Sequence, residues 1–288
     1  MPALPPLPAE ILFHLGPLPV SNTLINAVLV MALFALMGWL LARQARIQRP
    51  ATNAPRGLLN FWEAIVEFLA GYVDNVTKDR AKTDRFLPIV GGIFLFILTS
   101  NWLGLLPGMS SIGLFRAGEF IPVFRSANTD LNLTLSMAVF AVIASHLFGV
   151  AAIGFFRYAN KFIKLGDIWQ AIKSGKPMGI LVAIIEFFVG LIEIFSEVAK
   201  IVSLSLRLFG NIFAGEVLLT VLASLLAGYG AFLIPLPFML LELIVGLVQA
   251  TVFAMLTLVY LSIATTDLHG HEESTSQVAA IEDQTPTV

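Results

Sequence analysis

The sequence predicts an all-α polytopic membrane protein with about five membrane crossings and one amphipathic surface helix. Of its 288 residues, 57% are hydrophobic and only 12% are charged, and the mean hydropathy is +0.87. A water-soluble domain typically carries about 25% charged residues. Several apolar runs also reach the roughly 20 residues that a helix needs to cross a bilayer. We therefore expect a single membrane domain over residues 1–288.

Charge, proline and glycine mark the boundaries of the expected elements. The first 20 residues are rich in proline, and we expect an irregular outer segment there. Residues 57–77 mix aromatic with acidic side chains, which is typical of a helix lying on the membrane surface. We expect the tail over 267–288 to be polar and without regular structure. The first three expected spans cover 21–42, 86–107 and 131–156.

Two long apolar segments close the membrane part of the chain. A helix over 178–228 would be about 75 Å long at about 1.5 Å per residue. The hydrocarbon core of a bilayer is only about 30 Å thick. This segment must therefore tilt strongly, bend or break into two pieces. A turn at Tyr229 and Gly230 separates it from the last helix, 231–266.

Basic residues predict the orientation, because cytoplasmic loops are enriched in lysine and arginine. The 43–85 loop holds eight such residues and the 157–177 loop holds five, whereas the 108–130 loop holds only Arg116 and Arg125. Five crossings then put the N-terminus outside and the C-terminus in the cytoplasm. Counting 178–228 as two crossings would instead put the C-terminus outside.

Arg207 lies in an apolar stretch, where a charge is costly. A guanidinium stays protonated at physiological pH and cannot neutralise itself on burial. Placing it at membrane depth costs from about 2.5 to more than about 10 kcal/mol, depending on the reference state. An intramembrane cation is therefore a functional-site hypothesis whose partner has to be found.

A polar stripe follows one face of the 178–228 helix. At about 100° per residue, its members fall within a sector of about 80°. Such a face is costly toward lipid, so we expect it to face protein or a water-filled path. The members are Glu186, Glu193, Glu197, Lys200, Arg207 and Asn211.

Further polar residues indicate a contact between the last two helices. Glu216 points about 140° away from Asn211, and we expect it to face the last helix. There, Glu242 and Gln249 share one face, and Gly246 between them permits close approach of a neighbouring backbone. Chains of intramembrane carboxyls suit proton relays, whereas a fixed guanidinium repels protons. The residues suggest two proton paths separated by a positive barrier.

Structural roles are the alternative for these residues. Glu197 and Lys200 could form an ion pair three positions apart on one helix. Arg207 could be the counter-ion of a carboxylate on its own helix or the last one. Asn211 and Gln249 could simply be interhelical hydrogen-bonding residues.

Other function classes find little support in the sequence. There is no cysteine, the four histidines are scattered, and no phosphate-binding glycine loop is present, so we expect no metal, cofactor or catalytic site. A net charge of −2 gives no reason to expect nucleic-acid binding. A membrane hydrolase would rest on Ser145 and His146, which are adjacent on a helix and do not face each other. A voltage sensor would need several regularly spaced arginines.

The segment 203–216, Ser-Leu-Ser-Leu-Arg-Leu-Phe-Gly-Asn-Ile-Phe-Ala-Gly-Glu, resembles the signature of subunit a of the membrane (Fo) sector of the rotary F-type ATP synthase. The resemblance extends to 249–253 and 256–261, with weaker similarity at 101–107 and 130–134. It covers most of the chain from residue 86 onward. It favours a strongly tilted hairpin of the last two helices, which would form the ion path.

This resemblance implies a stator that faces a rotating ring of c subunits. Arg207 matches the family's essential arginine, and Asn211 and Gln249 match polar positions beside it. Glu216 and Glu242 match the ionisable pair of the outer half-channel, where many relatives have one Glu and one His.

The remaining site residues follow from the same resemblance. Glu193 matches an acidic position in the inner half-channel, and we add Glu197 because it lies on the same face. Asp130 and Asn132 would lie near the outer mouth.

The implied mechanism couples proton flow to ring rotation and ATP synthesis. A proton enters from outside and neutralises a ring carboxylate. The neutral carboxyl can rotate through the lipid with the ring and then release the proton to the inner path. Arg207 blocks a direct leak between the two half-channels. The driving energy is about 2.3 kcal/mol per charge per 100 mV, plus the pH term.

The implied partners are the c-subunit ring, the peripheral-stalk b subunits, the remaining ATP synthase subunits and the lipid bilayer. The ion is H+, with Na+ as the alternative, and the place is a bacterial inner membrane or an organelle inner membrane. The alternative function is a stand-alone ion-coupled secondary transporter, although the internal repeat common in such proteins is not found here.

Overall fold

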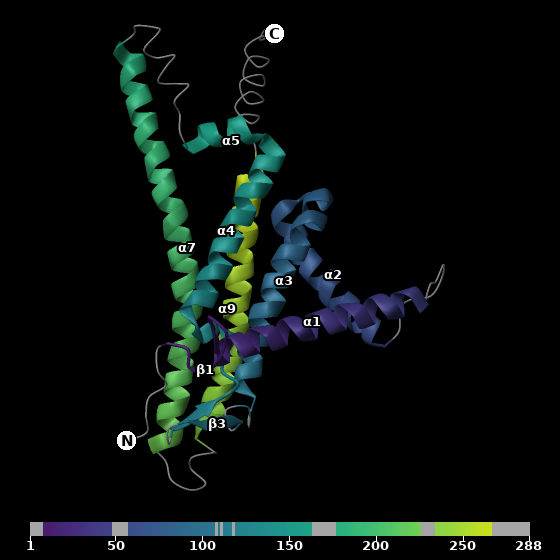
Figure 1. Ribbon diagram of the computed structural model, residues 1–288. Helices are drawn as coiled ribbons and strands as arrows, with labels where there is room; N and C mark the ends of the chain where they lie inside the picture. The colour runs from purple at the N-terminus through teal and green to yellow at the C-terminus, as the bar shows by residue number, and fades with distance from the viewer. Residues whose placement is uncertain are drawn as a thin grey trace. The chain divides into compact units, whose positions relative to one another are not determined.

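The computed structural model describes residues 8–47, 57–106, 109, 112–116, 119–162, 177–225 and 234–266 (Figure 1). The prediction of an all-α membrane protein is confirmed: within these residues, five helices are long and apolar enough to cross a membrane. They cover Asn22–Arg46, Arg80–Leu105, Leu131–Ile153, Ile185–Leu225 and Pro235–Ala264. The chain's internal contacts define two compact units, Met1–Phe140 with Lys200–Leu258, and Ala141–Ala199 with Val259–Val288.

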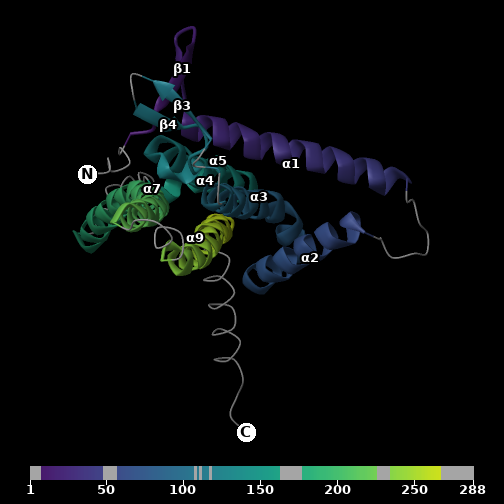
Figure 2. The same ribbon diagram turned by 90° about the horizontal axis from the view of Figure 1, so that it is seen from below.

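The first unit begins with a β-hairpin of β1 (Ile11–Leu15) and β2 (Leu18–Ser21). The prediction of an irregular backbone for this segment is therefore wrong from Ile11 onward. Four of the five residues of β1 are apolar, and Gly16 supplies the turn at φ 65°, a conformation that glycine adopts without a Cβ penalty. Pro19 is tolerated because a two-stranded sheet has only edge strands. Figure 2 shows this hairpin extending from the start of α1.

The next three helices are close to the predicted ones, with two boundary differences. The first helix, α1 (Asn22–Ile47), runs through the basic residues expected to stop it, and α2 (Leu58–Thr77) matches the predicted surface helix. The following α3 (Arg80–Leu105) starts six residues before the expected span, because the Asp79 carboxylate caps it by accepting a hydrogen bond from the Ala81 N–H.

The expected polar loop before residue 131 contains short regular elements. Strands β3 (Gly113–Arg116) and β4 (Glu119–Pro122) form a second hairpin, and a 3-10 turn, η2 (Ala127–Thr129), follows. The segment between β4 and η2 carries Arg125, which is buried.

The predicted span over 131–156 ends three residues early. Helix α4 covers Leu131–Ile153, and Gly154, at φ 94°, leaves the helical conformation. A short amphipathic helix, α5 (Phe155–Phe162), follows.

The two last helices are α7 (Pro177–Leu225) and α9 (Pro235–Ala264). Of the three possibilities for the long segment, a break is excluded, because α7 is one continuous helix of 49 residues. In the first unit, Asn211 meets Gln249 and Gly215 meets Glu242, so α7 and α9 run antiparallel, as a hairpin requires. Their tilt in the bilayer stays a prediction. The expected tail over 267–288 lies outside the described residues.

Candidate functional site

The interface of α7 and α9 brings together two of the predicted polar positions. The Asn211 side-chain amide donates to Gln249 Oε1 at 2.8 Å. One turn further along α7, Gly215 packs directly against the carboxyl group of Glu242, where any Cβ would collide with it. The small residue therefore makes the space in which Glu242 lies.

Glu242 and Gln249 are both buried in the first unit. Glu242 Oε1 and Gln249 Nε2 are among the buried atoms that have no hydrogen-bond partner within the described part of the chain. Such atoms are costly in an apolar environment unless water or a proton satisfies them. The two residues are seven positions apart and lie on one face of α9.

Gly246, between these two residues, contacts α3. Its carbonyl accepts a hydrogen bond of 3.4 Å from the Asn101 side chain, and a Cβ at this position would lie 3.2 Å from Asn101 Cβ. The neighbour of Gly246 is therefore a side chain of α3, and not the backbone of a neighbouring helix that the sequence led us to expect. Asn128 donates to Asn101 at 2.7 Å and Trp102 donates to the Leu243 carbonyl at 3.2 Å, so α3 fixes the position of α9.

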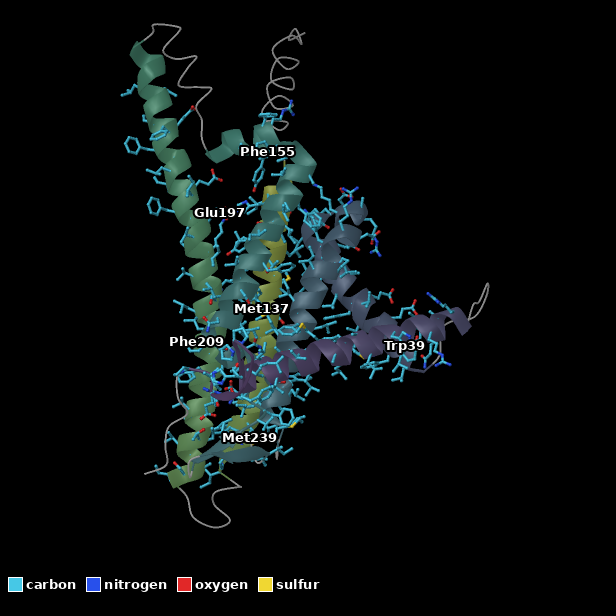
Figure 3. All side chains as sticks on the ribbon, in the orientation of Figure 1. Trp39, Met137, Phe155, Glu197, Phe209 and Met239 are labelled. Atoms are coloured by element: carbon cyan, nitrogen blue, oxygen red, sulfur yellow. The ribbon has the colours of Figure 1, made fainter. Side chains whose placement is uncertain are left out.

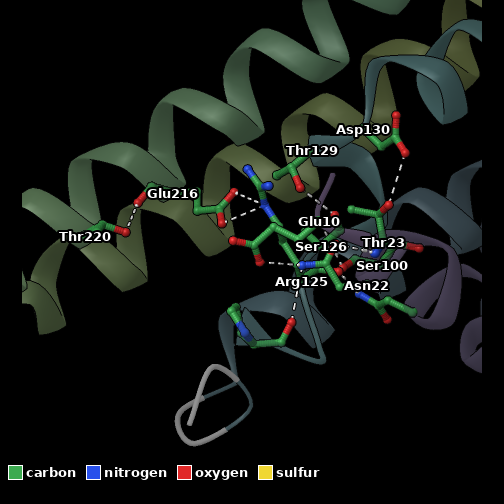
Figure 4. Close-up of polar contacts among 12 residues, drawn as sticks. Glu10, Asn22, Thr23, Ser100, Arg125, Ser126, Thr129, Asp130, Glu216 and Thr220 are labelled. Carbon is green, nitrogen blue, oxygen red and sulfur yellow. Dashed lines mark hydrogen bonds and ion pairs between the residues drawn. The ribbon is translucent and has the colours of Figure 1, made fainter. Parts of the chain in front are cut away.

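Glu216 forms a salt bridge that the sequence reasoning missed. Arg125 Nε lies 2.9 Å from one carboxylate oxygen of Glu216 and 3.0 Å from the other (Figure 4). The Arg125 side chain is only 3% exposed, and its guanidinium carbon lies 5.9 Å from the centre of the Phe213 ring. The expected partner of Glu216, the last helix, is thus replaced by the segment before η2.

The start of α1 holds this segment in place. Asn26 donates to the Arg125 carbonyl at 2.9 Å, Asn22 donates to the Pro122 carbonyl at 3.3 Å, and the Thr23 hydroxyl donates to Asp130 at 3.1 Å (Figure 4). Arg125 is therefore presented to Glu216 by contacts on both sides of it in the sequence.

Asp130 and Asn132, the residues predicted for the outer mouth, lie at the start of α4. The Asp130 carboxylate accepts a hydrogen bond from the Asn132 N–H at 2.9 Å, which is the geometry of a helix N-cap. Asn132 is exposed. The capping role accounts for Asp130, and a role for either residue in ion entry stays a prediction.

Arg207 is exposed on α7, with its buried neighbours Leu204 and Leu208 packed toward the protein. Its guanidinium donates to the Ser203 hydroxyl, one turn earlier, at 3.3 Å. Among the described residues, no carboxylate forms an ion pair with Arg207. Within the described part of the chain, the alternative role of Arg207 as counter-ion of Glu216 or Glu242 is therefore unsupported.

Glu193 and Glu197 belong to the second compact unit. Glu197 Oε2 lies 3.6 Å from His146 Nε2, and His146 Nδ1 shares a hydrogen bond of 2.7 Å with the Tyr158 hydroxyl. Burial, reinforced by the negative charges of Glu197 and Glu193, raises the pKa of Tyr158 to about 12. Figure 3 labels Glu197 on α7 and Phe155 at the start of α5. The ion pair of Glu197 with Lys200 stays an alternative.

The described site thus consists of the buried Glu242, the half-buried Glu216 in its salt bridge with Arg125, the hydrogen-bonded amides of Asn211 and Gln249, and the exposed Arg207. The family model of the ATP synthase A chain matches residues 24–262. The chain belongs to the ATP synthase A chain family. The function expected from the sequence, that of a proton-translocating stator subunit of the F-type ATP synthase, is confirmed by this membership.

Individual members of the ATP synthase A chain family are similar over most of their length. The chain is 31% identical to ATP synthase subunit a of Moorella thermoacetica over 264 residues, which cover 92% of this chain and 98% of the relative. It is 33% identical to ATP synthase subunit a of Mycobacterium leprae, covering 84% of each chain. It is 32% identical to that of Gloeobacter violaceus, covering 90% of each.

The tight packing at Gly215 makes a testable prediction. We expect Gly215→Ala to displace the Glu242 carboxyl, because the added Cβ occupies its place. ATP-driven proton pumping by the assembled complex should then fall severalfold. Gly92→Ala, in open space on α3, is the matched control and should pump normally. Equal pumping by the two variants would contradict the assignment of Gly215 as the residue that accommodates Glu242.

Proposed function

We propose that this member of the family conducts protons through two half-channels to and from the carboxylates of a c-subunit ring, with Arg207 as the barrier between them. One observation carries the proposal: Arg207 is exposed and no described carboxylate forms an ion pair with it. A permanent cation in an apolar helix needs an anionic partner. A ring carboxylate from another subunit supplies that partner.

The outer half-channel uses Glu216 and Glu242. The salt bridge between Arg125 and Glu216 holds one carboxylate ready, while Glu242 lies at Gly215, next to Glu216 in the sequence. A proton that enters weakens the pair of Glu216 with Arg125 by neutralising the carboxylate. It then passes by way of Glu242 to the ring carboxylate. Asn211 and Gln249 line this route as hydrogen-bonding groups, and Asp130 and Asn132 stand at its entrance.

The inner half-channel uses Glu193 and Glu197. Both precede Arg207 in α7 and share its polar face in the sequence pattern. The ring carboxylate loses its proton there when the guanidinium favours its ionised form. Because Arg207 repels protons, the two half-channels exchange them only through the moving ring.

The partners are other subunits of the ATP synthase, and the orientation follows from the basic loops. The c-ring lies against Arg207, and the peripheral-stalk b subunits and the other ATP synthase subunits complete the machine. The enrichment of the 43–85 and 157–177 loops in lysine and arginine supports an N-terminus outside and a C-terminus inside. The multi-pass chain resides in the cell membrane, since the relatives named above are bacterial proteins.

Glutamine substitutions test the outer path. Glutamine keeps the shape and hydrogen-bonding capacity of glutamate but cannot carry a proton. We expect Glu242→Gln to lower ATP-driven pumping by about tenfold or more, as loss of a positioned proton carrier does, and Glu216→Gln to lower it as well. Pumping is measured in reconstituted liposomes that contain the assembled complex. Glu63→Gln, at an exposed position of α2, is the control, and normal pumping by the Glu216/Glu242 double variant would contradict the outer path.

A further inference from the structure

The second compact unit contains a line of three titratable side chains. It runs from Glu197 on α7 through His146 on α4 to Tyr158 on α5, with distances of 3.6 Å and 2.7 Å between successive groups. The three side chains line one open cavity of about 360 Å³, whose other walls include Val150, Phe155 and Ile194. Three proton-bearing groups at a cavity wall form a chain rather than an isolated ion pair.

Exposure gives this chain a direction. The Glu197 side chain is 16% exposed, whereas that of His146 is 30% exposed. Both side chains line the cavity, and the imidazole is the more exposed of the two. The gap of 3.6 Å between Glu197 Oε2 and His146 Nε2 is closed by a small side-chain rotation or by one bridging water.

Histidine is the residue suited to such a place, because an unperturbed imidazole changes its charge between about pH 5 and pH 8. The Tyr158 hydroxyl holds the ring at Nδ1 and remains protonated at physiological pH. The other titratable group acting on this cluster from α7 is Glu193, and Arg157 adjoins Tyr158 on α5. The cluster therefore combines one exchangeable proton site with fixed hydrogen-bonding neighbours.

We propose that His146 is the proton-carrying residue that links Glu197 to the aqueous phase, and that Tyr158 is its positioning residue. The inference rests on the proposed function, in which Glu197 belongs to the inner half-channel. When a proton leaves through the inner half-channel, the O–H bond of the Glu197 carboxyl breaks and an N–H bond forms at His146 Nε2. The imidazolium then gives a proton to water in the cavity and returns to the neutral ring. ATP-driven pumping runs the same steps in reverse.

Chemical rescue tests the relay. The assembled complex carrying His146→Ala is assayed for ATP hydrolysis in the presence of an uncoupler, so that no pH gradient is built up or dissipated by added buffer. We expect hydrolysis to fall about tenfold and free imidazole, which is small enough for the cavity, to restore it in a concentration-dependent manner. His146→Gln, which fills the site without a titratable group, should be slow and should not respond to imidazole.

Two further variants complete the test. Tyr158→Phe should keep part of the rate but shift its pH profile, since the hydroxyl no longer holds Nδ1. Arg207→Ala, assayed in parallel, reports on the proposed function itself: normal pumping there would overturn that function. If Arg207→Ala abolishes pumping, two results would overturn the relay alone. One is hydrolysis by His146→Ala at the wild-type rate. The other is a loss of hydrolysis in the assembled His146→Ala complex that imidazole does not restore.

Discussion

Replacing Arg207 with alanine is expected to abolish ATP-driven proton pumping while the complex stays assembled. The side chain is exposed, and among the described residues it donates a hydrogen bond to Ser203 at 3.3 Å, so its loss removes little packing. It does remove the cation that repels protons and attracts the ring carboxylate. Pumping is recorded in liposomes, and passive proton flux under an imposed potential is recorded separately. Pumping should fall to background, and the passive flux should persist or rise.

Two control variants separate the charge from the shape of the side chain. Ser203→Ala removes the intramolecular partner of Arg207 and should pump almost normally. Arg207→Lys keeps a positive charge, but as a point charge on a flexible stem. We expect this variant to keep the passive proton flux low while its ATP-driven pumping is reduced. Normal coupled pumping by Arg207→Ala would leave Arg207 without the barrier role.

Arg125→Ala is expected to impair both stability and pumping. Removing one partner of a buried ion pair leaves the other charge uncompensated, which costs about 3–5 kcal/mol. The loss of stability should be about 3 kcal/mol, at the lower end of this range, because the Glu216 side chain is 28% exposed. The measurements are the amount of this subunit in the assembled complex, the thermal midpoint of the purified complex and the pumping rate.

A double variant distinguishes the structural from the functional part of this effect. Arg125→Ala combined with Glu216→Gln has no unpaired charge, so it should recover most of the lost stability but not the pumping. Arg116→Ala, which removes the other basic residue of the same loop, should leave both unchanged. If the double variant were as unstable as Arg125→Ala alone, the salt bridge would not be the source of the stability.

Hydropathy predicted the membrane helices, because these depend on local composition, whereas the hairpin of α7 and α9 was implied by the resemblance to the family. The contact at Gly246 was predicted only in part, because the glycine indicated a near neighbour but not that this neighbour is the Asn101 side chain of α3. The helix boundaries that differed depend on single residues. Asp79 caps α3 earlier than the hydropathy suggests, and Gly154 ends α4 before the apolar sequence does.

The pairing of Arg125 with Glu216 could not be predicted in this way. The two residues are 91 positions apart, and no periodic pattern relates them. In the sequence, Arg125 counted only as a loop charge that set the orientation. His146 was a scattered histidine whose neighbour Ser145 points elsewhere, and its contact with Tyr158 depends on the turn that Gly154 makes before α5. Contacts between residues that are far apart in the sequence can be identified only from the folded structure.

The contacts around Arg125 also decide when the outer route can be completed during synthesis. Asn22 reaches Pro122 across 100 positions, Thr23 reaches Asp130 across 107, and Arg125 reaches Glu216 across 91. At about 5–20 residues per second, a ribosome needs roughly 5–20 seconds to make each such stretch. The first helix therefore enters the membrane well before its partners exist. A nascent chain acquires the proposed outer route only near the end of translation, so under that proposal a half-made subunit has no assembled conduit through which the membrane could lose its proton gradient.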